Sequence, residues 1–451
     1  MQTKLDLLNG DIKKSLIKLS IPLTLTAFVQ MTYNLIDTIW IGRLGTDAVA
    51  AVGVSSFIIW LANSIGLIPK IGMGIYSSQA IGKNDIKDTV KILTNGYIQA
   101  ILISLVFMLG LSIFKDSFIE FYDLKAKVNN LTKAYLLIIN FGLPFLFINP
   151  MFSQAFHSMG DSMTPFKINF VGLVFNIIMD PVLIFGLGPF PSLGIKGAAL
   201  ATIMAQGLVS LIFIIIMRFK DSVYRDSLRI FDFSTKWQSR IFKLGFPASI
   251  LNTIHALIAI VLNRFMSYYG EVPVAVYTIG SQLESITWMT TEGCQVAISS
   301  LVAQNYGAEK FQRVRESSKE GLKLVSYIGI FATIVLFAFR NVLFVAFVPN
   351  DPETIALGAK YLAILSASEL FMAIEIGATG IYNGLSDTRT PAMISVIFNL
   401  ARIPFSLFFM KYYEVLGVWI AMSLSSIIKG VLCLSLLNKK IERKIKVKSI
   451  F

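Results

Sequence analysis

The sequence predicts an all-α integral membrane protein with twelve transmembrane helices in two parallel six-helix repeats. Three observations support this fold class. The 451 residues are 55% hydrophobic and only 15% charged, their mean hydropathy is +0.68, and landmark residues recur about 225 positions apart. Such a chain is too apolar for a water-soluble globule. A bilayer needs roughly 20 apolar residues per helix, so the chain accommodates about twelve spans and leaves no separate soluble domain.

Apolar runs, and the polar residues that separate them, predict the individual helices. The first six are expected at 15–41, 48–81, 92–114, 131–156, 164–187 and 194–217. The second six are expected at 243–267, 274–305, 321–347, 354–382, 391–410 and 416–437.

The two sets of helices have the features of a duplication. LSIP at Leu19–Pro22 matches LGFP at Leu244–Pro247, and GDSMTP at Gly160–Pro165 matches SDTRTP at Ser386–Pro391. Six helices per copy is an even number, so both copies enter the membrane in the same orientation, as a parallel repeat. We therefore expect an N-terminal lobe at 1–217, a cytoplasmic linker at 218–240, and a C-terminal lobe at 241–451 with a basic cytoplasmic tail.

The net charge of +13 has two interpretations, nucleic-acid binding or membrane topology. Most Lys and Arg residues fall in the termini and the even-numbered connections, as the positive-inside rule requires if both termini are cytoplasmic. We therefore expect a multi-pass protein of the cell membrane, in contact with the bilayer and not with nucleic acid. Cys294 and Cys433 lie far apart in apolar segments, so no disulfide framework is indicated.

At these landmarks the chain resembles the multidrug and toxic compound extrusion (MATE) transporters, in particular their DinF-like branch. The resemblance rests on the repeated loops GDSMTP and SDTRTP, the Gln-x-x-Gly ends of helices two and eight, and QLES at Gln282–Ser285. It implies a MATE-type fold with two lobes around a central cleft. It also implies export of amphipathic, often cationic, small organic compounds in exchange for protons or sodium.

Ionisable residues inside membrane helices are costly and are default candidates for function. Counting 1.5 Å per residue from the nearest outer loop places Asp37, Asp180, Asn176 and Thr202 in a similar outer-half layer of the first lobe. These hard oxygen donors suit a proton or a sodium ion. They are therefore the predicted ion-coupling residues, with Na⁺ as a possible metal at Asp37 and Asp180.

A purely structural role is the alternative for both aspartates. Asp180 precedes Pro181 and could cap a local backbone distortion, and Asp37 could hydrogen-bond to a neighbouring helix. The resemblance favours coupling, because the DinF-like branch carries aspartates at matching places, and Asn176 in FNIIMDP also fits that branch. Lys70 lies roughly 25 Å from Asp37 in depth, so it is expected to line the inner cavity or to snorkel to the cytoplasmic face.

The second lobe has its own charges at mid-depth. We expect Glu284 to form a buried pair with Arg402 or with Lys429. His255 and Met372 stand where the sodium-coupled branch of the family has carboxylates, which argues against coupling of that kind here. Glu375, one turn beyond Met372, is a possible substitute. His255 is interpreted as a hydrogen-bonded interior group or as a proton carrier.

Aromatic, methionine and amide side chains near the expected cleft form a candidate apolar substrate surface, although ordinary helix packing also explains them. They are Met31, Tyr33, Asn34, Phe57, Trp60, Met151, Phe152, Trp288 and Met289.

Several functional classes are disfavoured by the sequence. No G-x-x-x-x-G-K-[ST] motif occurs, so ATP hydrolysis is not expected. No nucleophile with a matched base can be identified, so we expect no enzyme activity and no cofactor beyond the coupling H⁺ or Na⁺. The predicted function is a cation-coupled antiporter, acting as a monomer. A flippase for lipid-linked saccharides is the alternative, although it would need a more cationic cleft.

Overall fold

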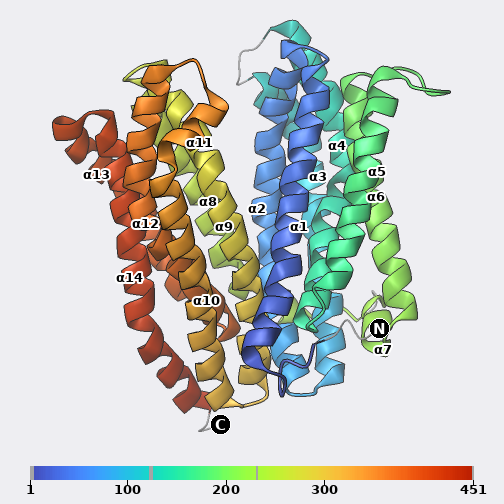
Figure 1. The fold of residues 1–451 in the computed structure, drawn as a ribbon. Helices are drawn as coiled ribbons and strands as arrows, with labels where there is room; N and C mark the ends of the chain where they lie inside the picture. Colours follow the sequence, from blue (N-terminus) through green and yellow to red (C-terminus); the bar gives the residue numbers. More distant parts are fainter. Residues whose placement is uncertain (1–4, 121–124, 230–231, 449–451) are drawn as a thin grey trace. The chain divides into compact units, whose positions relative to one another are not determined.

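The computed structural model of the protein describes residues 5–120, 125–229 and 232–448, and Figure 1 shows its helices in chain order. Within these ranges the regular structure is α-helical, as predicted. The fourteen helices are α1 (Ile12–Gly42), α2 (Thr46–Gly82), α3 (Ile86–Glu120), α4 (Ala126–Ser158), α5 (Met163–Phe185), α6 (Ile195–Phe219), α7 (Ser222–Ser227), α8 (Thr235–Ser267), α9 (Glu271–Gly307), α10 (Phe311–Ala338), α11 (Arg340–Phe347), α12 (Pro352–Gly384), α13 (Arg389–Tyr413) and α14 (Val415–Lys448).

Twelve of these helices are long, and α7 and α11 are short. Within the described ranges, eleven helices are long and apolar enough to cross a membrane. The remaining long helix, α9, is interrupted by Gln, Glu, Ser and Thr side chains. The predicted twelve-helix architecture is confirmed, because a helix satisfies its backbone hydrogen bonds internally and can therefore lie in lipid.

One predicted helix is divided in the structure. The sequence predicts a single helix at 321–347, but α10 ends at Ala338 and α11 begins at Arg340. The Arg340 side chain donates a hydrogen bond to the Phe337 carbonyl, which satisfies one of the orphan acceptors that a helix end leaves. Sequence hydropathy does not register this break because both pieces are apolar.

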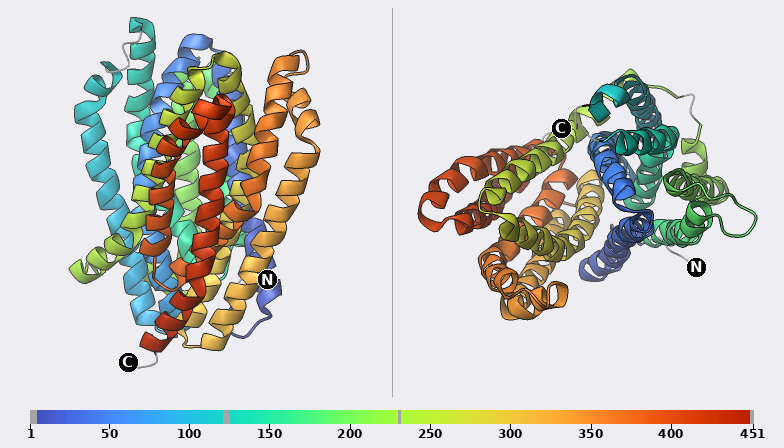
Figure 2. Two further views of the ribbon diagram at one scale, coloured as in Figure 1. Left: turned by 90° about the vertical axis from the view of Figure 1, so that its left-hand side faces the viewer. Right: turned by 90° about the horizontal axis from the view of Figure 1, so that it is seen from above.

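The chain folds into two compact units. Unit 1 is formed chiefly by Leu25–Ser249, and unit 2 by Asp6–Thr24 with Ile250–Phe451. These bounds differ from the expected lobes, because α1 divides near Thr24 and α8 near Ser249. In Figure 2, the right-hand view looks along the helices, and each unit is a bundle seen nearly end-on.

Local contacts explain why the start of the chain belongs to unit 2. Asn305 Nδ2, at the end of α9, donates to the Leu7 carbonyl at 3.0 Å, and Arg313 donates to the Gly10 carbonyl at 2.7 Å. Within unit 1, Gly72 of α2 lies directly against the Ile241 backbone of α8. A side chain on Gly72 would prevent this approach, so the first part of α8 packs on unit 1.

The repeat extends to unusual backbone conformations. Asn84 and Glu309, which end equivalent turns 225 residues apart, have φ of 58° and 60°. Gly160 and Ser386 are likewise equivalent and have φ of 80° and 56°. Left-handed conformations are unfavourable for non-glycine residues, so their recurrence reflects the same loop geometry in both copies.

The GDSMTP loop is held by a buried aspartate. Asp161 accepts hydrogen bonds from the Thr164 amide and hydroxyl, and its Oδ2 pairs with Lys220 Nζ at 2.6 Å. Burial by itself raises the pKa of Asp161, but the hydrogen bonds from Lys220 and Thr164 outweigh it and hold the pKa below its ordinary value. The loop therefore depends on the charged carboxylate.

The SDTRTP loop repeats this arrangement in unit 2. Asp387 accepts from the Thr390 amide and hydroxyl, and its Oδ2 lies 3.1 Å from Lys440 Nζ. Burial again raises the pKa of Asp387, and the bonds from Thr390 and Lys440 again lower it overall. Each loop is thus tied to the end of the last long helix of its repeat, α6 or α14.

Candidate functional site

Two polar side chains of α5 face the same direction inside unit 1. Asn176 and Asp180 are one turn apart, so they share a helix face. Both are fully buried, and Asn176 Nδ2 donates a hydrogen bond to Asp180 Oδ1 at 3.0 Å. This bond orients the Asp180 carboxylate toward a side-chain partner. The alternative that Asp180 only caps a backbone distortion at Pro181 is not needed, since α5 continues through Pro181 to Phe185.

Asp37 of α1 lies within electrostatic reach of Asp180. Asp37 Oδ1 and Asp180 Oδ2 are both buried, and neither has a hydrogen-bond partner among the residues that the structure describes. Two carboxylates in a region of low dielectric repel each other, and a proton or a metal cation between them relieves that repulsion. The pair therefore forms a candidate cation site, which we call the α1–α5 site.

Hydroxyl groups surround the α1–α5 site. Tyr33, one turn before Asp37, is buried and interacts with Thr202 of α6 as well as with both carboxylates. The structure thus brings together the four residues that depth counting placed in one layer. Their role in coupling remains a prediction.

Tyr135 of α4 also lies within electrostatic reach of Asp37 and Asp180. The sequence identified Tyr135 only as a landmark of the repeat, matching Tyr361. Its recurrence in a buried helix was the signal that could have marked it as a site residue.

A small cavity of about 30 Å³ opens beside the α1–α5 site, between α1, α5 and α6. It is large enough for a water-sized molecule. Tyr33 lines it together with the amide side chains of Gln30, Asn169 and Gln206. Sequence analysis missed these amides because depth counting considered mainly ionisable groups.

Lys70 of α2 takes no part in the α1–α5 site. It interacts electrostatically with His157 in the last turn of α4, far along the helices from Asp37. This agrees with the depth count, which argued against a direct pair with Asp37.

The candidate substrate surface divides into exposed and core residues. Met151 is fully buried in the core of unit 1, and Phe152 packs edge-on against Tyr97 with ring centroids 5.2 Å apart. As placed here they are core residues, because α4 turns this face toward its neighbours α2 and α3, and the cavity assignment does not fit them. Asn34 and Trp288 are exposed. The remaining predicted residues of this surface are partly exposed: Met31, Phe57, Trp60 and Met289.

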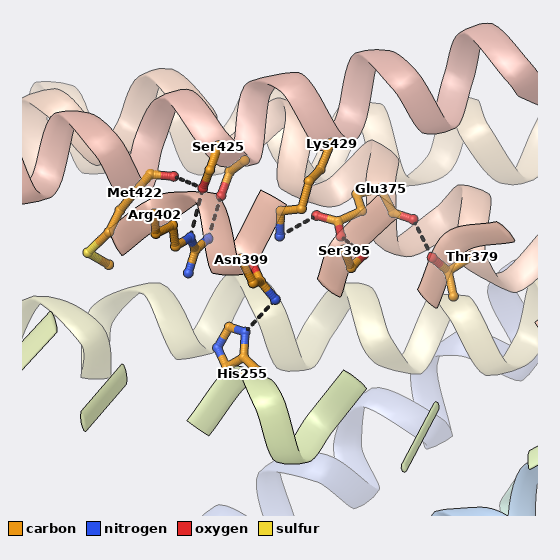
Figure 3. Close-up of polar contacts among 10 residues, drawn as sticks. His255, Glu375, Thr379, Ser395, Asn399, Arg402, Met422, Ser425 and Lys429 are labelled. Carbon is orange, nitrogen blue, oxygen red and sulfur yellow. Dashed lines mark hydrogen bonds and ion pairs between the residues drawn. The ribbon is translucent and has the colours of Figure 1, made fainter. Parts of the chain in front are cut away.

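Unit 2 contains a buried ion pair that the sequence predicted with the wrong partner. Lys429 Nζ lies 3.0 Å from Glu375 Oε2, and Ser395 donates a hydrogen bond to Glu375 Oε1 at 2.5 Å (Figure 3). The sequence analysis proposed Glu284 as the partner of Lys429. α12 and α14 instead bring Glu375 to Lys429, so Glu375 is a charge partner and does not act as a lone substitute carboxylate.

Arg402 of α13 is held by hydroxyl groups. Its Nε donates to Ser425 Oγ at 2.7 Å and its other nitrogen to Ser426 Oγ at 3.0 Å (Figure 3). Glu284 feels the positive charge of Arg402, but the described residues show no ion pair between them. The predicted direct pair is therefore corrected to an interaction at longer range.

His255 of α8 lies beside an amide of α13. Its Nδ1 is 3.4 Å from Asn399 Nδ2 (Figure 3). This geometry fits the interpretation of His255 as a hydrogen-bonded group.

No group of three or more His, Cys, Asp or Glu side chains able to hold a metal ion is found in the described part of the chain. A sodium ion at the α1–α5 site would therefore have to take its further ligands from amide and hydroxyl oxygens. The set of Asn176, Thr202 and Tyr33 supplies such oxygens, which hard cations accept.

The fold and site define a multi-pass membrane transporter built from two related bundles, with carboxylates buried inside a bundle. The model of the MatE family matches residues 22–182 and 247–408. This chain therefore belongs to the MatE family. The two matched segments begin at Pro22 and Pro247, which are the equivalent prolines of the duplication.

Named relatives agree with this membership over nearly the whole chain. The probable multidrug resistance protein NorM of Thermotoga maritima is 27% identical over 94% of this chain and 91% of its own. The FAD transporter of Shewanella oneidensis is 26% identical over 96% of both chains. The family and these relatives are transporters, not enzymes.

Solved structures share the fold. A MATE transporter in a bent conformation has a TM-score of 0.91, with 21% identity over 98% of both chains. A transporter of the MOP superfamily from Pyrococcus furiosus has a TM-score of 0.89 and covers 97% of this chain and 98% of its own, also at 21% identity.

Proposed function

We propose that this protein is a cation-coupled antiporter that exports amphipathic, often cationic, organic compounds by alternating access. Asp37 and Asp180 bind the coupling ion, H⁺ or Na⁺, and Asn176, Thr202 and Tyr33 complete its surroundings. The observation that carries the proposal is the pair of buried carboxylate oxygens without hydrogen-bond partners in the described ranges. Such a pair is expensive unless a cation neutralises it.

Coupling requires differential affinity. The ion has to bind one conformation of the transporter better than the other, and the exported compound has to prefer the opposite one. Neutralising the α1–α5 site then shifts the population of the two states. The protein acts as a monomer in the cell membrane, with both termini in the cytoplasm as the distribution of basic residues requires.

The identity of the exported compound has two supported candidates. The relatives named as multidrug resistance proteins favour organic drugs. The relative named as an FAD transporter makes an anionic flavin nucleotide the second candidate. Transport of lipid-linked saccharides ranks lower, because the α1–α5 site is acidic and would repel pyrophosphate.

Reconstituted liposomes test the proposal. A cationic dye and FAD are offered separately, under a pH gradient without sodium and under a sodium gradient at constant pH. Asp37→Asn is expected to lower gradient-driven exchange at least about tenfold, since it removes one of two ion ligands. Asp47→Asn is the matched control, because it alters only an exposed pair with Lys127 on the surface. Unchanged exchange in Asp37→Asn would contradict the role assigned to the α1–α5 site.

A further inference from the structure

A second pair of unpaired carboxylates lies inside unit 2, between α9 and α12. Glu369 of α12 is 1% exposed, and its Oε2 has no hydrogen-bond partner among the described residues. Glu284 of α9 is within electrostatic reach of Glu369, and its buried Oε1 is likewise without a partner in those ranges. The sequence analysis considered Glu284 but not Glu369.

Close packing holds these two helices together at this point. Gly280 of α9 lies against the ring of Tyr361 on α12, where even a methyl group would collide. Farther along, Gly380 of α12 lies against the Gln295 backbone of α9. Glycines on both helices thus let the backbones approach, as is common for helices in membranes. The two glutamates therefore face a narrow interior space.

Hydroxyl groups accompany both glutamates. The Tyr361 side chain is fully buried and interacts with Glu284, while Thr287, one turn from Glu284, interacts with Glu369. The Tyr361 ring is fixed edge-on against Trp419, with centroids 5.0 Å apart. Its hydroxyl has no hydrogen-bond partner within the described part of the chain. An oxygen ligand is thus held in place beside the carboxylates.

The tyrosine gives this cluster a counterpart in unit 1. Tyr361 is equivalent to Tyr135 in the repeat, and Tyr135 lies beside Asp37 and Asp180. Each unit therefore has the same tyrosine next to two buried carboxylates. The carboxylates themselves come from different helices, α1 and α5 in unit 1 but α9 and α12 in unit 2.

The surrounding charges indicate how much positive charge is missing. The groups facing Glu284 are Arg402 on α13 and, on α9 and α12, the phenols of Tyr277 and Tyr361. Lys429 of α14 is already paired with Glu375. Two carboxylates with a single neighbouring guanidinium leave one uncompensated negative charge, which matches one monovalent cation.

We propose that Glu284 and Glu369 form a second cation site, which binds one H⁺ or Na⁺ with the hydroxyl groups of Tyr361 and Thr287 as further oxygen ligands. The proposal concerns binding and does not depend on which compound the protein exports. It also does not depend on the α1–α5 site, because the two sites lie in different units.

Thermal unfolding of the purified full chain tests this proposal separately from transport. The background variant is Asp37→Asn/Asp180→Asn, in which the α1–α5 site cannot be charged. NaCl is titrated against choline chloride at constant ionic strength, at acidic and at alkaline pH, and the midpoint of unfolding is followed by tryptophan fluorescence. A ligand that binds only the folded state raises this midpoint.

If the site takes sodium, NaCl raises the midpoint of the background variant, and added Glu369→Gln raises the half-saturating concentration at least about tenfold. If it takes only a proton, NaCl has no effect, and the midpoint depends on pH in the background but much less after Glu369→Gln. Glu353→Gln, an exposed glutamate of the same helix, is the matched control and should leave either response unchanged.

A second variant covers the case in which Glu369→Gln folds poorly. Tyr361→Phe keeps the ring against Trp419 and removes only the hydroxyl, so it is expected to weaken the same response severalfold. Absence of any response to sodium or pH in the background overturns the proposal. So does a response that both Glu369→Gln and Tyr361→Phe leave unchanged.

Discussion

In unit 1 the carboxylates of Asp37 and Asp180 interact with each other, whereas in unit 2 Glu375 lies 3.0 Å from Lys429 and is further bonded to Ser395. The first arrangement leaves a negative charge that an ion can neutralise. The second is already neutral and has its hydrogen bonds in place. Two copies of one ancestral bundle have therefore acquired different buried chemistry at comparable positions in the fold.

The difference shows how a transporter can separate stability from ion response. A buried pair with its own counterion contributes a fixed structural element, and removing one partner strands the other charge. A pair of like charges contributes little stability by itself but makes the energy of the bundle depend on the ion. The Glu284–Glu369 pair resembles unit 1 in this respect, although it lies in unit 2.

Breaking the Glu375–Lys429 pair is expected to have the largest effect. Lys429→Met should lower the free energy of unfolding by about 3–5 kcal/mol, because Glu375 is left buried and uncompensated. The measurement is SDS-driven unfolding in mixed micelles. In unit 1, Asp180→Asn should leave the unfolding midpoint unchanged or raise it, since it removes one of two like charges.

The double variant Lys429→Met/Glu375→Gln is the control for this prediction. It should recover most of the loss, because neither charge is then stranded. Strictly additive losses in the double variant would mean that the two residues do not act as a pair.

Removing the loop aspartates should have an intermediate effect, of the same size in both units. Asp161→Asn and Asp387→Asn are each expected to cost about 1.5–3 kcal/mol, because each carboxylate accepts bonds from a lysine and a threonine. A much larger loss in one unit than in the other would show that the two loops are not equivalent.

The pH dependence follows from the same two groups. The folded-state pKa of each aspartate lies below its ordinary value of 3.8. Their stabilisation is therefore complete above pH 3.8 and is lost as the pH falls through the folded-state pKa. Unfolding midpoints measured between neutral and strongly acidic pH should fall less steeply in each asparagine variant than in the unaltered protein.

The smallest expected effect concerns the loop position at which the two copies differ. Ser386 adopts a left-handed conformation with φ of 56°, whereas the equivalent residue of unit 1 is Gly160. Ser386→Gly should stabilise the protein by about 0.5 kcal/mol, the relief of backbone strain being partly offset by the entropy of glycine. Thermal unfolding measures the change, and Gly160→Ser is the reciprocal variant, expected to be destabilising. A stabilising Gly160→Ser would refute this account of the loop.

The sequence by itself determined the number of long helices, the duplication and the depth of the buried polar residues. Hydrophobic length sets where a helix can span a bilayer, and the repeated loops are local in sequence. Counting residues along α1, α5 and α6 was therefore enough to place Asp37, Asp180, Asn176 and Thr202 in one layer.

Only the tertiary structure decided which residues in a layer face one another. Depth gives the height of a residue along a helix, but rotation of the helix and packing against distant segments set the direction of its side chain. For that reason the partner of Lys429 proved to be Glu375, Met151 and Phe152 proved to be core residues, and Glu369 emerged beside Glu284. Contacts between helices far apart in the chain determine these pairings, and no local pattern encodes them.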